Sequence, residues 1–105
     1  MSNAVLKLDD AEVQTRLQTL PAWTVSNGGL RREFSFPSFP SSIFFVNAVA
    51  HFAELAAHHP DIHILYNRVI LHIATHSVGG ITEKDFALAH NVDELWHAFD
   101  VQPGA

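Results

Sequence analysis

The first third of the chain shows one short helical pattern, followed by two segments with the two-residue period of β-strands. Apolar residues recur at helical spacing over residues 9–20, where an aspartate pair at the start can supply the N-cap. Residues 23–26 and 30–36 then alternate as strands, and Asn27-Gly28-Gly29 between them is a hairpin signal. Charged residues lie among the apolar ones in the second strand, so we expect an antiparallel pair with one face in solvent.

A longer helical pattern occupies the middle of the chain. Ser38 is a suitable N-cap, Pro40 is tolerated in the first turn, and a broad apolar stripe follows. Pro60 disfavours helical geometry in the residue before it, so we expect the helix to end near His59. This places His58 and His59 in the last helical turn.

The remaining sequence predicts a second pair of strands and a final helix. Residues 62–66 and 69–75 alternate like strands, but Asn67-Arg68 is too weak a turn signal to fix their connection. The sequence Thr82-Glu83-Lys84-Asp85 fits a capping box, and apolar residues continue at helical spacing to Phe99.

These elements follow the order α-β-β-α-β-β-α in what we interpret as a single domain over residues 1–105. Because the strands come as hairpin-like pairs, the simplest packing is an α+β fold. We expect a four-stranded antiparallel sheet with helices packed on one face, which leaves the other face open for a partner.

Composition supports a folded domain and narrows its partners. The 105 residues are 48% hydrophobic, which is enough for a core at this size. A formal net charge of −5 argues against direct nucleic-acid binding, and the lack of cysteine excludes disulfides, thiolate metal sites and a cysteine nucleophile. We find no stretch long and apolar enough to span a membrane and no signal-peptide pattern. We therefore expect a cytoplasmic protein without a membrane partner.

The stretch ELAAHHP, residues 54–60, carries the candidate chemistry. Glu54 lies four residues before His58, so on a helix its carboxylate can orient the imidazole for acid/base catalysis near neutral pH. A simpler alternative is that both histidines of the pair only satisfy carbonyls at a helix end. A metal site built from His58, His59 and His63, with His76 brought in by the fold, is the third interpretation. No known ligand spacing is matched, so we expect no metal.

A set of motifs in this part of the chain resembles the signature of the pterin-4a-carbinolamine dehydratases. The set comprises Glu54-x-x-x-His58-His59-Pro60, Tyr66-Asn67, Thr75-His76 and Gly80-x-Thr82-x-x-Asp85. The resemblance implies an α+β fold, a homodimer or homotetramer, and a reaction without metal or organic cofactor. That reaction removes water from a 4a-hydroxytetrahydropterin and gives quinonoid dihydropterin, a step in tetrahydrobiopterin recycling. The alternative is a non-enzymatic dimerising coactivator or assembly module on the same fold, with a protein partner.

The same resemblance implies roles for individual side chains. His59 matches the position of a general base on the ring nitrogen, while His58 and His76 would hold and protonate the leaving hydroxyl. Glu54 would orient His58, and Asp85 matches a motif acid with a supporting role. The residues expected to bind the pterin, partly through main-chain groups, are Ala57, His58, His59, Ala74, Thr75 and His76.

Overall fold

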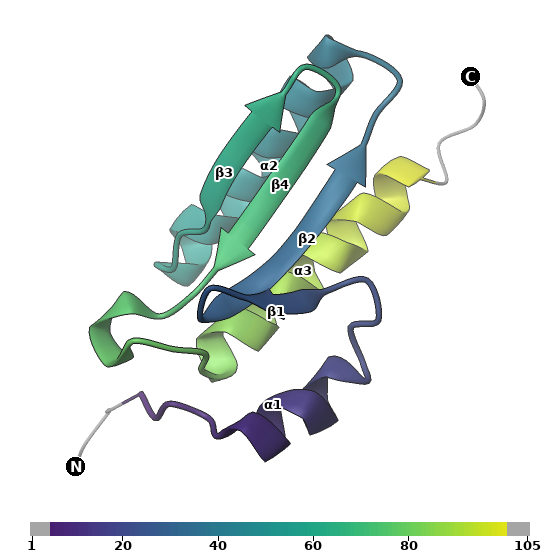
Figure 1. Cartoon of the computed structure of the whole chain (residues 1–105). Coiled ribbons are helices and arrows are strands. Elements are labelled where there is room, and N and C mark those ends of the chain that lie inside the picture. The colour runs from purple at the N-terminus through teal and green to yellow at the C-terminus, as the bar shows by residue number, and fades with distance from the viewer. Residues whose placement is uncertain (1–4, 101–105) are drawn as a thin grey trace.

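One antiparallel sheet of four strands carries the fold, and its strands lie in the order β1-β2-β4-β3 (Figure 1). In this computed structural model, which describes residues 5–100, the predicted order α-β-β-α-β-β-α is confirmed. The elements are α1 (Asp10–Leu17), β1 (Thr24–Ser26), β2 (Gly29–Ser35), α2 (Phe39–Ala56), β3 (Asp61–Leu65), β4 (Arg68–Ile73), the short 3-10 helix η1 (His76–Val78) and α3 (Glu83–Asp100). The predicted domain also includes residues 1–4 and 101–105, which lie outside the described residues.

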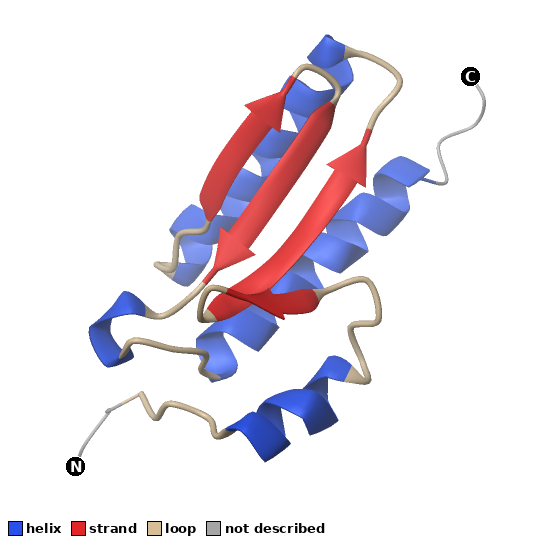
Figure 2. Ribbon diagram, viewed as in Figure 1, coloured by secondary structure: helices blue, strands red, loops and turns tan. Residues whose placement is uncertain are grey.

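Helices α2 and α3 lie side by side against one face of the sheet (Figure 2). This is the α+β packing expected from the sequence. The short helix α1 lies beyond β1, near the start of α3 (Figure 1). There Arg16 of α1 forms an ion pair of 3.4 Å with Glu83 of α3.

The covered face of the sheet and the two long helices enclose a core rich in aromatic rings. The ring centroid of Phe34 lies 4.9 Å from that of Phe45 and 5.2 Å from that of Trp96, within the range at which aromatic pairs attract. The other large buried side chains of the core include Leu30 of β2, Val69, Leu71 and Ile73 of β4, Val49 of α2, and Phe86, Leu88 and Val92 of α3. The apolar faces predicted for β2, β4 and α3 are therefore confirmed, whereas the broad apolar stripe of α2 also includes the exposed Phe44 and Leu55.

Arg32 lies on the covered face of β2, where the alternation would place an apolar residue. Its guanidinium lies 2.6 Å from the carboxylate of Asp93 and 4.4 Å from the ring centroid of Phe34. The indole N–H of Trp23 donates to the same carboxylate at 2.7 Å. The charge of Arg32 is thus paired and stacked where it is shielded from water, which lets the strand keep its register.

Both hairpins turn in two residues. Asn27 and Gly28 have φ values of 49° and 74°, as a type I′ turn requires, so the predicted first hairpin is confirmed. Tyr66 and Asn67 join β3 to β4, and Tyr66 has a φ of 56°. The connection that the sequence left open is therefore a tight turn.

The apolar character of α2 exceeds what the sequence suggested. Its residues Phe39–Ala56 have a mean hydropathy of 1.2, so by length and composition alone this helix passes as a membrane-spanning candidate. The expectation that no stretch meets this test is wrong. Core helices of soluble proteins also meet it, and Phe45, Val49 and Ala53 are buried on the side of α2 that meets the core. Phe44 is exposed.

Candidate active site

The helix α2 ends just before the histidine pair, because Ala57 adopts left-handed backbone geometry with a φ of 52°. The backbone N–H groups of Ala57 and His58 donate to carbonyls of the last turn, at 3.2 Å to Glu54 and 3.1 Å to Ala53. The expectation that the two histidines occupy the last helical turn is therefore wrong. Beyond the helix they face different surroundings: His58 is buried and His59 is exposed.

His58 is held by a carboxylate from the other long helix. Its Nε2 lies 2.6 Å from Oδ1 of Asp85, in the first turn of α3. A carboxylate can only accept, so the Nε2–H of His58 donates and Nδ1 remains for other partners. The prediction that Glu54 orients His58 is wrong, because Asp85 does so.

Asp85 also caps α3, as the capping box predicts. Its Oδ2 accepts the backbone N–H of Thr82 at 2.8 Å and the hydroxyl of Thr75 at 2.8 Å. The hydroxyls of Thr75 and Thr82 lie 2.8 Å apart, and the Asp85 side chain is fully buried. The acid thus joins the end of β4, the start of α3 and the ring of His58 in one buried hydrogen-bond network. Such networks are rigid when every group is satisfied.

Glu54 pairs with His59 instead. Its Oε2 lies 2.8 Å from Nε2 of His59, and the two side chains are 77% and 62% exposed. The spacing of four residues that links Glu54 to His58 holds only within a helix. Because the chain leaves the helix at Ala57, the residue five positions on comes within reach. An exposed pair of this kind contributes about 0–1 kcal/mol to folding.

His76 approaches the pair from the far end of β4. It opens η1, and the preceding Thr75 donates its N–H to the carbonyl of Gly80 at 2.9 Å, which closes the loop around it. His58, His59 and His76 together line a hollow of about 250 Å³. The full lining is Ala57, His58, His59, Ala74, Thr75, His76, Ser77 and Lys84.

All six residues predicted to bind the substrate line this hollow. Their roles, and those of the three histidines in catalysis, stay predictions. Ser77 and Lys84 were missed, although they adjoin the motif residues His76 and Asp85 in the chain. Proximity to a motif residue was the one signal that the sequence held for them.

The hollow brings together imidazoles in two kinds of surroundings. His58 is buried and anchored, while His59 and His76 are exposed and can exchange protons with water. A site of this composition can give a proton to one atom of a ligand and take one from another. Among residues 5–100, no group of three or more histidine, aspartate or glutamate side chains is arranged to hold a metal ion.

Known proteins are similar to this chain in sequence and in fold. Residues 6–95 match the sequence profile of the family described as pterin 4 alpha carbinolamine dehydratase. A protein of Roseiflexus sp. (strain RS-1), provisionally named a pterin-4-alpha-carbinolamine dehydratase, is 49% identical over 89 residues, covering 85% of this chain and 96% of that protein.

Two solved structures extend the comparison. The transcriptional coactivator/pterin dehydratase from Brucella melitensis has a TM-score of 0.82 and 32% identity, over 86% of this chain and 98% of its own. A pterin dehydratase-like protein described as a RuBisCO assembly factor in the alpha-carboxysome has a TM-score of 0.57 and 26% identity. This match covers 70% of this chain and 84% of that protein's chain. From its match over residues 6–95 and these relatives, the chain belongs to the pterin-4-alpha-carbinolamine dehydratase family.

Proposed function

We propose that this protein removes water from a 4a-hydroxytetrahydropterin to give quinonoid dihydropterin. The observation that carries the proposal is the hollow in which His58, His59 and His76 meet. Family membership supports the same reaction.

The reaction needs two proton transfers at neighbouring atoms. The bond between C4a and its hydroxyl breaks, and the hydroxyl leaves as water after it gains a proton. The ring nitrogen next to C4a loses its proton, and its electron pair forms the new double bond to C4a. Protons balance, so the protein must act as acid and as base but needs no other reactant.

We assign the base to His59 and the acid side to His58 and His76. The exposure of His59 supports this, because a base that takes a proton must return it to water. The anchoring of His58 by Asp85 supports a fixed position for the leaving hydroxyl. Reduction of the quinonoid product would regenerate the tetrahydropterin, so the reaction belongs to cofactor recycling.

The test is the rate at which chemically generated 4a-hydroxytetrahydropterin loses water, followed by ultraviolet absorbance. Loss of a general base typically costs about 10²- to 10⁴-fold, so His59→Ala should remove most of the acceleration. His63→Ala, an exposed histidine of β3 outside the hollow, is the matched control and should keep the full rate. A wild-type rate in His59→Ala, with the fold intact by circular dichroism, would refute the assignment.

A second candidate is an interaction module on the same fold. The names of the two structural relatives favour it, and so do the exposed apolar residues Phe39, Phe44 and Leu55 on α2. We propose that these residues contribute to a homodimer or homotetramer. In sedimentation equilibrium, the wild type should be an oligomer and the Phe44→Asp variant should be a smaller species. A monomeric wild type would contradict the proposal.

A further inference from the structure

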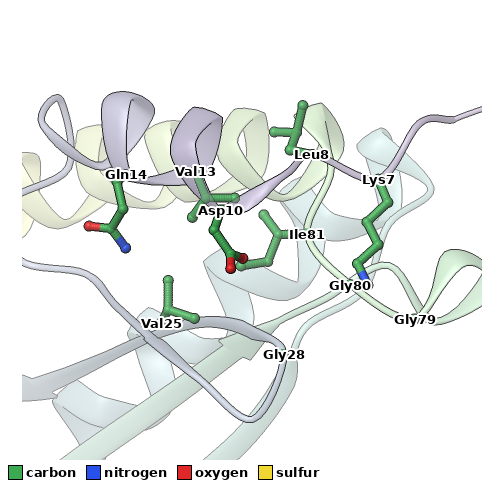
Figure 3. A pocket seen from close by; sticks show the side chains of 10 residues that line it. All are labelled: Lys7, Leu8, Asp10, Val13, Gln14, Val25, Gly28, Gly79, Gly80 and Ile81. Carbon is green, nitrogen blue, oxygen red and sulfur yellow. The ribbon is translucent and has the colours of Figure 1, made fainter.

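A second hollow, of about 430 Å³, lies between α1, the β1–β2 turn and the loop before α3 (Figure 3). Its wall is apolar and includes Val13, Val25 and Ile81, while Lys7, Asp10 and Gln14 bring polar groups to it. An apolar wall with a few polar groups is the usual composition of a small-molecule site, and the volume falls in the usual range. The dehydration step uses none of these residues.

A smaller hollow of about 200 Å³ adjoins both this one and the candidate active site. It shares Gly28, Gly79 and Gly80 with the larger hollow. It shares Ala74, Thr75 and His76 with the hollow of the three histidines. A Cβ built on Gly28 or Gly79 would have no atom within 4 Å, so space remains at this junction. The three hollows therefore follow one another, with His76 at the first junction.

Lys7 is held in place beside Gly80, where the smaller and the larger hollow meet. The backbone N–H of Leu8 donates to the carbonyl of Ile81 at 2.9 Å, which fixes this segment against the loop. The stem of Lys7 crosses Gly80 so closely that a Cβ there would lie 2.6 Å from the Lys7 Cε. Within residues 5–100, none of the ion pairs involves Lys7. Its ammonium is therefore available to an anion.

We propose that the larger hollow binds the substituent on C6 of an extended pterin. This inference rests on the proposed function. In a pterin, C6 is bonded to the ring nitrogen that is itself bonded to C4a. With C4a at the histidines, a substituent on C6 starts two bonds away and passes His76 into the adjoining hollows.

The lining defines the chemical class of this substituent. Val13, Val25 and Ile81 suit an apolar or aromatic segment. Lys7, at the junction with the smaller hollow, suits a carboxylate on the tail, and the carboxylate of Asp10 suits an N–H donor. The favoured substrate is thus a 4a-hydroxytetrahydropterin with an extended tail that carries an aromatic segment, an amide N–H and a carboxylate.

Two stable oxidised pterins test the inference by calorimetric titration: folic acid, which carries such a tail, and biopterin, which carries a short one. Wild type should bind folic acid about tenfold more tightly, which corresponds to burying one further apolar segment. Lys7→Gln should lower the affinity for folic acid about fivefold, as expected for one partly exposed ion pair, and leave biopterin unchanged. Val25→Asp, at a residue 44% exposed, should also weaken folic acid alone.

Matched variants separate the subsite from a general effect of charge. Lys7→Arg keeps the cation and should restore folic acid binding. Arg68→Gln removes one positive charge from the start of β4, outside the three hollows, and should change neither affinity.

The outcomes distinguish this inference from the proposed function. Equal affinity of wild type for both probes, or an equal effect of Lys7→Gln on both, would overturn the tail subsite and leave the dehydratase proposal standing. Failure of wild type to bind either pterin would overturn both.

Discussion

Asp85 has two tasks in this structure, and two substitutions separate them. Its side chain is fully buried and accepts hydrogen bonds from His58, from the hydroxyl of Thr75 and from the backbone N–H of Thr82. Asp85→Ala leaves His58 and the backbone N–H of Thr82 without an acceptor, while the Thr75 hydroxyl can still donate to the Thr82 hydroxyl 2.8 Å away. Each buried donor left unpaired costs about 1–3 kcal/mol, so we expect a loss of about 3–5 kcal/mol in the free energy of unfolding. That is a large share of the stability of a domain of this size.

Asp85→Asn keeps the shape of the side chain and one acceptor oxygen. With that oxygen toward Thr75 and Thr82, the cap of α3 survives, and the amide N–H₂ faces His58. The ring must then accept at Nε2 and carry its single proton on Nδ1, so it could give that proton to the leaving hydroxyl only by becoming an anion. We expect a stability loss of only about 1–2 kcal/mol. The dehydration rate should nevertheless fall by about 10²-fold, because His58 can no longer give a proton at Nδ1 while Nε2 keeps an N–H bonded to a carboxylate.

Urea unfolding followed by tryptophan fluorescence gives the first quantity, and initial rates of dehydration give the second. Nitrogen-15 chemical shifts of the His58 ring report the tautomer directly. A wild-type rate in Asp85→Asn with an inverted tautomer would show that His58 takes no part in the reaction. Unchanged stability in Asp85→Ala would show that the buried network does not exist in solution.

Three further predictions concern stability. Glu54→Ala should change the free energy of unfolding by less than about 1 kcal/mol, because its pair with His59 is exposed; urea unfolding checks this, and a larger loss would refute it. Asp93→Asn should cost about 2 kcal/mol in the same assay, because it removes the charge that faces the partly buried Arg32. The control Glu33→Gln on the open face should cost about 0–1 kcal/mol, and equal losses would contradict this. Gly28→Ala should lower stability by about 1–2 kcal/mol in thermal unfolding, because φ is 74° there; an unchanged melting temperature would be evidence against the turn geometry.

Local signals in the sequence predicted the elements well. Ser38 and Thr82 cap their helices as expected, and Asn27-Gly28 turns the first hairpin. These features depend on residues within a few positions of one another, so the chain itself carries the information. The motif residues of the candidate site were predicted in the same way, through their spacing along the chain.

The errors have a common physical origin. Ala57 and Tyr66 adopt positive φ without being glycine, and no propensity marks such positions. The end of α2 at Ala56 then decides which carboxylate meets which histidine. The pair of His58 with Asp85 joins residues 27 positions apart, and that of Arg32 with Asp93 joins residues 61 apart. Such partners follow from the packing of α3 against the rest of the fold, which periodicity alone does not determine.

The most direct test of the proposed activity is a stopped-flow experiment with the protein in excess over freshly generated 4a-hydroxytetrahydropterin. Formation of quinonoid dihydropterin is followed by absorbance. Free imidazole, at eight molecules per chain to match the eight histidines, serves as the control. We expect a rate that saturates with protein concentration and exceeds the imidazole rate by at least about 10²-fold. A rate equal to that of imidazole, without saturation, would contradict a dehydratase site at His58, His59 and His76.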